Sequence, residues 1–217
     1  MTTTLRARAI LFDMDGTLVD STAIVERVWG RFADEHGVSI ADIMRTSHGV
    51  KAHDTIRRHG PRGIDVDVAA ADLAAFEIEQ TDGLIEIAGA GRFVEQVPES
   101  GFALVTSAPH ALARKRLELC GIRVPSVVVA AEDVAHGKPD PEPYLTAAAA
   151  LGIKPVDCVV FEDAAAGIHS ALAAGMRVVV VGGITDDVAH GLTRIVDYTG
   201  SSIARVDETG FSIVLGN

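Results

Sequence analysis

Residues 12 to 21 of the chain read FDMDGTLVDS and directly follow the apolar run ARAIL at residues 7 to 11. An apolar run of this length is typical of a strand that is buried on both faces, so we predict a strand at residues 7 to 12, with Asp13 and Asp15 at its end. Side chains two residues apart in a strand point to the same face. The two carboxylates therefore repel each other unless the chain turns, a cation binds between them, or one of them takes a proton. The pair alone fits a solvated strand end as well as a functional site.

The composition limits the classes of partner. With 217 residues, the chain fits one large domain or a core with an inserted subdomain. Nineteen basic and thirty acidic residues give a formal charge of -11, which repels nucleic acid and anionic membranes, so we expect neither as a partner. No apolar stretch approaches the ~20 residues of a membrane helix. The N-terminal residues lack the apolar centre and cleavage site of a signal peptide, so we expect a cytoplasmic protein. Cys120 and Cys158 are expected to be free.

Apolar runs of strand length alternate with helical patterns along most of the chain. Further predicted strands occupy residues 102 to 106, 126 to 130, 158 to 161 and 177 to 181, and predicted helices occupy residues 110 to 121, 141 to 152 and 164 to 175. Each helical pattern closes in glycine, which is a common signal at helix ends. Alternating strands and helices predict an α/β fold with a parallel sheet and right-handed crossovers.

One interval breaks this alternation. Between about residues 21 and 84 four helical patterns follow one another, and no strand candidate separates them. We predict that residues 21 to 84 form an inserted α-helical subdomain and that residues 1 to 20 and 85 to 217 form the core. The last residues, 201 to 217, predict two short strands around a turn at Glu208, Thr209 and Gly210.

Polar groups follow four of the predicted strands, at the edge of an open α/β sheet where ligands bind. They are Asp13, Asp15, Thr106, Ser107, Lys138, Glu162 and Asp163. Carboxylates are ligands that Mg²⁺ prefers, and Lys138 and Thr106 can contact a phosphoryl group, with backbone amides near Ser107 as further donors. Asp13 is then available as a covalent nucleophile, and Asp15 as the acid for the leaving alkoxide and the base for water. Together these groups predict phosphoryl transfer.

The motifs FDMDGT, VTS, the lysine of GKPDP and FEDAAAGI, in this order, resemble the four motifs of the haloacid dehalogenase superfamily. The helical insertion resembles the first type of cap in that superfamily, and the resemblance covers essentially the whole chain. It implies a Rossmann-like core, Mg²⁺ dependence and the roles given above. It also implies a metal site that includes Asp13, Asp15, Glu162 and Asp163, with Asp15 contributing its backbone carbonyl.

Other reactions of similar proteins leave alternatives open. Dehalogenases proper lack the second aspartate and need no Mg²⁺, so Asp15 argues against them. Beta-phosphoglucomutases carry a histidine in the first cap helix, where this chain has Val25, so the sequence favours a hydrolase while leaving a phosphosugar mutase as the alternative. A receiver-type phospho-switch is a remote alternative, because a switch that holds its phosphate has no use for Asp15.

The cap offers hints about the substrate. Residues 23 to 32, 47 to 60 and 138 to 145 resemble glycerol-3-phosphate, 2-deoxyglucose-6-phosphate and related sugar phosphatases, so we expect a small polyol or sugar phosphate. The predicted substrate-binding residues are Thr17, Ser107, His48, Gly49 and Lys51. Lys51 and Asp54 alternatively form an exposed pair at helical spacing, and Trp29 is expected to pack inside the cap. We expect a monomer or a weak dimer.

Overall fold

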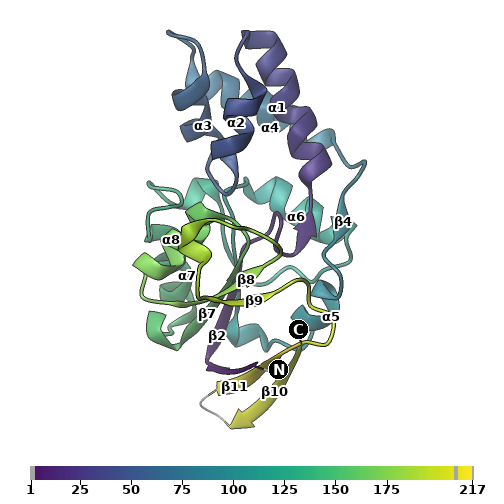
Figure 1. The fold of residues 1–217 in the computed structure, drawn as a ribbon, viewed down its shortest axis with the longest axis vertical. Coiled ribbons are helices and arrows are strands. Elements are labelled where there is room, and N and C mark those ends of the chain that lie inside the picture. Colours follow the sequence, from purple (N-terminus) through teal and green to yellow (C-terminus); the bar gives the residue numbers. More distant parts are fainter. Residues whose placement is uncertain (1–2, 208–209, 217) are drawn as a thin grey trace.

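The computed structural model describes residues 3–207 and 210–216 of an α/β protein. Four helices lie together at one end of the molecule, above the carboxyl ends of the central strands, and a hairpin lies at the opposite end (Figure 1). Among the described residues, no helix is both long and apolar enough to cross a lipid bilayer.

The central sheet contains six parallel strands in the order β6-β5-β2-β7-β8-β9. Their bounds are β2 Ala9–Phe12, β5 Phe102–Val105, β6 Val127–Val129, β7 Cys158–Glu162, β8 Arg177–Val181 and β9 Thr193–Ile195. All residues of β2, β5 and β7 are buried, because helices cover both faces of the sheet. The parallel sheet is confirmed, and β2 lies at its centre between β5 and β7.

Alternate residues of the strands supply two separate hydrophobic cores. Ile10 and Phe12 point to the face covered by α5 (Ala90–Val94) and α6 (His110–Leu119). Leu11 points to the opposite face, which is covered by α7 (Glu142–Leu151) and α8 (Ala165–Ala173). The three helices predicted in this part of the chain, α6, α7 and α8, are therefore confirmed, and each holds one face of the sheet away from water.

The four predicted helices of the inserted cap are also present. They are α1 Thr22–His36, α2 Ile40–Ser47, α3 Ala52–His59 and α4 Val66–Glu79. Local capping starts two of them: the Ser39 side chain accepts from the N–H of Asp42 at α2, and Asp65 does the same at α4. The cap has its own hydrophobic core, in which Trp29 is 7% exposed, so its predicted packing role is confirmed.

A short antiparallel ribbon joins cap and core. The chain leaves the core through β3 (Val19–Asp20) and returns through β4 (Ile85–Glu86), and these two strands pair with each other. The sequence patterns do not predict this ribbon, α5 or β9, because each element has only two to five residues and too few side chains to show a period.

The predicted strand at residues 7 to 12 is wrong as a single element. Residues Thr3–Ala7 form β1, which belongs to a second, antiparallel sheet of order β1-β11-β10, and the chain bends at Arg8 before β2 begins. The predicted C-terminal strands are β10 (Ser202–Asp207) and β11 (Gly210–Leu215), which pair antiparallel. Of the predicted turn, Glu208 and Thr209 lie outside the described residues.

Candidate active site

The topology brings the predicted motifs to one edge of the sheet. Asp13 follows the last residue of β2, Thr106 follows β5 and Asp163 follows β7. Because β2 pairs with both β5 and β7 in parallel, these three ends are neighbours in space. Lys138 comes from the loop that follows β6, and it reaches the same edge.

Lys138 is the buried cation of the site. Its ammonium is 1% exposed and donates to Asp13 Oδ1 (2.6 Å), Glu162 Oε1 (2.7 Å) and the carbonyl of Val105 (3.1 Å). An ammonium has three N–H groups, so all of them are used. Burial lowers the pKa of this group, but the carboxylates of Asp13 and Glu162 outweigh burial and hold it above its usual range. Lys138 is therefore a fixed positive charge beside Asp13.

Glu162 is held by four donors. Its Oε1 accepts from Lys138 and from the hydroxyl of Tyr144 (3.1 Å), and its Oε2 accepts from the backbone N–H groups of Asp163 (2.8 Å) and Ala164 (2.9 Å). A Cβ at Gly167 of α8 would lie 1.5 Å from Oε1, so only glycine fits there. The carboxylate is 0% exposed and oriented by its surroundings, which suits a residue that positions Lys138.

Three carboxylates form a group that fits a divalent cation. Oxygen atoms of Asp13, Glu162 and Asp163 lie within 4.8 Å of one another. Burial raises the pKa of Asp13 well above its usual range; Lys138 opposes this, and Glu162 and Asp163 add to it. Three carboxylates against one lysine leave an excess of negative charge that Mg²⁺ would offset. The carboxylate of Asp15 is not in this group, so the assignment of Asp15 to the metal through its backbone carbonyl stays a prediction.

The side chain of Asp15 is instead held by an arginine that the motifs do not include. Asp15 Oδ1 accepts from the Ser21 hydroxyl (2.6 Å) and from Nη1 of Arg116 (2.7 Å), and Nη2 of Arg116 donates to Glu77 Oε1 (2.8 Å) in cap helix α4. Burial raises the pKa of Glu77, and the charge of Arg116 opposes this rise. A signal for Arg116 does exist in the sequence: it lies three and four residues after Ala113 and Leu112, on the apolar face of α6.

The predicted substrate-binding residues mostly join the cap to the core. Nε2 of His48 lies 2.6 Å from Asp163 Oδ2, and the Ser107 hydroxyl donates to the carbonyl of Gly49 (2.8 Å). The hydrogen bond with Asp163 raises the pKa of His48 to about 9, against burial. Thr17 is fully buried, and its hydroxyl donates to Asp163 Oδ1 (3.3 Å). Gly49 has φ +74°, and a Cβ there would lie 2.9 Å from the Cβ of Ala164, so the loop contacts Ala164 of the core closely.

Lys51 also contacts the core, and its pairing with Asp54 is wrong. Its ammonium donates to the carbonyl of Val134 (2.7 Å), and its stem packs against Gly137, where an added Cβ would lie 2.7 Å from Lys51 Cγ. The side chain is buried, whereas Asp54 accepts from Arg57 (2.7 Å). Sequence spacing suggested an exposed helical pair because it carries no information about the core loop that covers Lys51.

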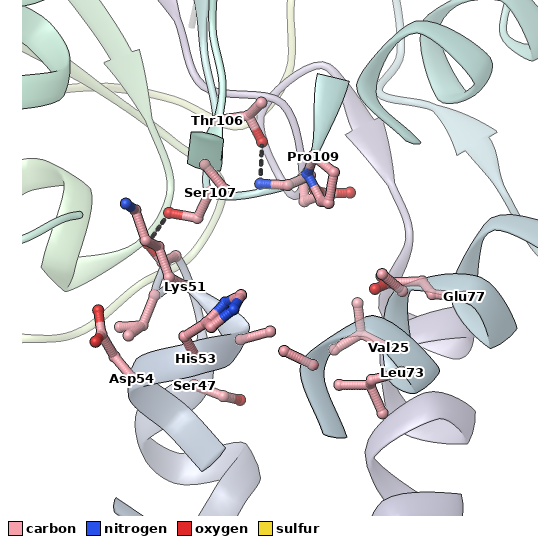
Figure 2. A pocket seen from close by; sticks show the side chains of 18 of the residues that line it. Val25, Ser47, Lys51, His53, Asp54, Leu73, Glu77, Thr106, Ser107 and Pro109 are labelled. Carbon is pink, nitrogen blue, oxygen red and sulfur yellow. Dashed lines mark hydrogen bonds between the residues drawn. The ribbon is translucent and has the colours of Figure 1, made fainter. Parts of the chain in front are cut away.

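A cavity of about 580 Å³ lies between cap and core. Its core side includes Asp13, Asp15, Thr106 and Ser107, and its cap side includes Val25, Trp29, His48, Lys51, His53, Leu73 and Glu77. Figure 2 shows Val25, Leu73 and Glu77 of the cap lying across the cavity from Thr106, Ser107 and Pro109 of the core. Thr106 keeps its hydroxyl at the site by accepting from the N–H of Ala108 (3.1 Å). The nucleophile candidate Asp13 therefore lines a cavity whose other wall is the cap.

Known proteins are similar to this chain in sequence and in fold. The chain is 39% identical over 203 residues to hexitol phosphatase A of Escherichia coli (strain K12), which covers 88% of this chain and 94% of that protein. It is 32% identical to glycerol-1-phosphate phosphohydrolase 2 of Saccharomyces cerevisiae, covering 81% and 74%. The structure of β-phosphoglucomutase from Clostridium difficile superposes with a TM-score of 0.79 over 89% of this chain and 92% of that one, at 20% identity, which shows the fold alone.

A family model also matches residues 7–175, and its description is haloacid dehalogenase-like hydrolase. The match spans the motifs after β2, β5 and β7 together with the whole cap. The chain belongs to the haloacid dehalogenase-like hydrolases.

Proposed function

We propose that this protein is a Mg²⁺-dependent phosphatase that hydrolyses a small polyol or sugar phosphate through an aspartyl-phosphate intermediate on Asp13. The observation that carries the proposal is the contact of Asp13 with buried Lys138 at the end of β2, facing the cavity under the cap. Family membership supports the hydrolase class. The two sequence relatives named above supply the substrate class, because one is named as a phosphatase for a hexitol and the other for glycerol 1-phosphate.

Asp13 forms the covalent bond to phosphorus. Its Oδ1 accepts from Lys138, whereas Oδ2 has no donor among the described residues and is the oxygen left to attack. Attack forms the Oδ2–P bond and breaks the bond from phosphorus to the leaving oxygen, which takes a proton from Asp15. Water then attacks phosphorus, Asp15 takes a proton from that water, and the Oδ2–P bond breaks to release phosphate.

The other groups stabilise charge on the transferring phosphoryl group. Lys138 supplies a buried positive charge, and Thr106 with the backbone amides after it supplies donors at the end of β5. Asp13 and Asp163, with Glu162 beside them, would hold the metal. When bound, Mg²⁺ would offset the negative charge of the carboxylates and of the phosphoryl oxygens.

The cap recognises the leaving group in this proposal. Its boundaries at residues 21 and 84 fall beside the β3–β4 ribbon, so a movement about that ribbon would open and close the cavity. The mutase alternative is not favoured, because the wall of the cavity has Val25 where the mutases carry a histidine. The two sequence relatives named above, hexitol phosphatase A and glycerol-1-phosphate phosphohydrolase 2, are also named as phosphatases.

A substrate panel tests this function. Polyol, hexose, pentose and nucleotide monophosphates are compared by kcat/KM for phosphate release, with Mg²⁺ and with EDTA. We expect the highest values for polyol or hexose phosphates, loss of activity in EDTA, and no turnover by Asp13→Asn although its fold is intact. Activity that persists in EDTA, or a preference for nucleotides, would contradict the proposal.

A further inference from the structure

Arg116 connects the site to the cap and belongs to none of the superfamily motifs. It projects from α6 and is 3% exposed, although taking a charged group out of water has a cost. It bonds Asp15 of the core (2.7 Å) and Glu77 of the cap (2.8 Å). On the same helix, Arg114 pairs with Glu118 at 3.8 Å, and both of those side chains are more than half exposed. A surface pair of this kind contributes little, whereas burying Arg116 has a real desolvation cost.

The contact with Arg116 makes the two oxygens of Asp15 different. Oδ1 accepts from both Arg116 and Ser21, so two donors fix the carboxylate. Oδ2 has no donor among the described residues, and Asp15 lines the cavity. Oδ2 is therefore the oxygen that is free to carry a proton to or from a reacting group, and its direction is set by the bonds at Oδ1.

Glu77 makes this arrangement depend on the cap. It lies in α4, 39 residues before Arg116, and its side chain is 18% exposed where it meets the guanidinium. If the cap moves away, Arg116 loses this partner and keeps only the carboxylate of Asp15. Its Nε is already buried without a partner among the described residues, so no second acceptor is present to replace Glu77.

We propose that Arg116 is a positioning residue that holds Asp15 by one oxygen and keeps the other directed at the leaving group only while Glu77 of the cap is docked. This inference rests on the proposed role of Asp15 as general acid. It predicts that Arg116 matters most for substrates whose leaving oxygen needs a proton. An aliphatic alkoxide needs one, whereas p-nitrophenolate leaves without one.

The test compares kcat/KM for p-nitrophenyl phosphate with that for an aliphatic ester, taken as whichever of glycerol 3-phosphate, glucitol 6-phosphate and fructose 1-phosphate the wild type hydrolyses fastest. General acids contribute about 10²- to 10⁴-fold, so Arg116→Gln should lower the aliphatic value by about 10- to 100-fold and the nitrophenyl value by less than about threefold. Glu77→Gln, which keeps an acceptor for Arg116, should shift the ratio in the same direction by a smaller factor. Arg114→Gln is the matched control on α6 and should leave both values unchanged.

Equal losses on both esters, or a rise in KM alone, would overturn the inference, because they would mean that Arg116 binds substrate directly or only stabilises the fold. Melting curves check that the variants fold. If Arg116→Gln does not fold, the test rests on the ratio of the aliphatic to the nitrophenyl kcat/KM in Glu77→Gln. A ratio equal to that of the wild type overturns the inference. A wild type that hydrolyses neither class of ester would instead contradict the proposed function itself.

Discussion

Lys138 balances the charge of the carboxylate group at the end of β2. It contacts Asp13 and Glu162 at 2.6 and 2.7 Å, and both carboxylates are buried, with side-chain exposures of 7% and 0%. Without this cation, two buried negative charges would face each other and Asp163 with no positive partner from the core. The same contact orients Asp13, because it occupies one oxygen and leaves the other for phosphorus.

Lys138→Met tests this balance, because methionine keeps an apolar stem and removes the charge. Breaking a buried pair costs about 3–5 kcal/mol, so the metal-free variant should unfold at lower temperature. Removing a transition-state donor should lower kcat by about 10²- to 10³-fold. Added Mg²⁺ should raise the melting temperature of the variant more than that of the wild type, because the unbalanced carboxylates attract it more strongly. Exposed Lys154→Met is the control, and near wild-type turnover in Lys138→Met would argue against this role.

Single-residue roles divide into those that the motifs reveal and those that only tertiary contacts reveal. The positions of Asp13, Thr106 and Asp163 follow from sequence because each stands at or beside the end of an apolar run, and Lys138 lies in the loop that follows another such run. Arg116 could not be assigned a function in the same way. A basic residue on an apolar helix face indicates burial, but its partners lie 39 and 101 residues away.

Helix α8 shows how an element, and not only a residue, builds the site. It begins two residues after Asp163, and its third residue, Gly167, makes room for the Glu162 carboxylate. The backbone N–H groups of Asp163 and Ala164, just before the helix, both donate to Oε2 of Glu162. The strand end, the turn and the first turn of α8 therefore position one side chain together.

Gly167→Ala is predicted to displace Glu162, because the new Cβ would lie 1.5 Å from Oε1. Overpacking a buried site costs about 1–3 kcal/mol, and the displaced carboxylate should release Lys138, so we expect both a lower melting temperature and a large loss of kcat. Gly183→Ala is the matched control, because no atom lies within 4 Å of a Cβ there and its φ is not positive. Unchanged activity of Gly167→Ala would show that Glu162 does not need its observed position.

The elements that were predicted from sequence are the ones with a clear period or a long apolar run. The buried strands β5, β7 and β8 and all four cap helices belong to this class. The misassigned first strand shows the limit of this kind of prediction. Ala7 is apolar and buried like the residues of β2, so the composition of the run does not reveal the bend at Arg8. Side-chain pattern reports burial, whereas the partner strand is fixed by the rest of the chain.

At the scale of the whole molecule, the loop that links α2 and α3 joins the cap to the core by three contacts. His48 binds Asp163, Gly49 accepts from Ser107, and Lys51 donates to Val134. These contacts could not be predicted from sequence, because both sides of each contact are loop residues distant in the chain. They place the loop against the same strand ends that carry the candidate catalytic groups, so cap position and site geometry are linked.

Lys51→Met should loosen the cap. Methionine keeps the contact with Gly137 but loses the hydrogen bond to Val134, and bonds to charged groups contribute about 1.5–3 kcal/mol. We expect faster proteolysis at the β3–β4 connections and a higher KM, with a smaller change in kcat. Arg58→Met, an exposed change in α3, the helix that follows Lys51, is the control. Unaltered proteolysis and KM would mean that this contact does not hold the cap.

The covalent intermediate on Asp13 can be trapped directly. Enzyme mixed with an excess of substrate and Mg²⁺ is quenched in acid within the first turnovers, digested, and analysed by mass spectrometry. We predict an acid-stable acyl phosphate on the peptide that contains Asp13. Its amount should increase in Asp15→Asn, because loss of the base slows hydrolysis of the intermediate, and it should be absent in Asp13→Asn. Phosphate release at the wild-type rate with no phosphorylated Asp13 peptide in the wild type or in Asp15→Asn would contradict the proposed mechanism.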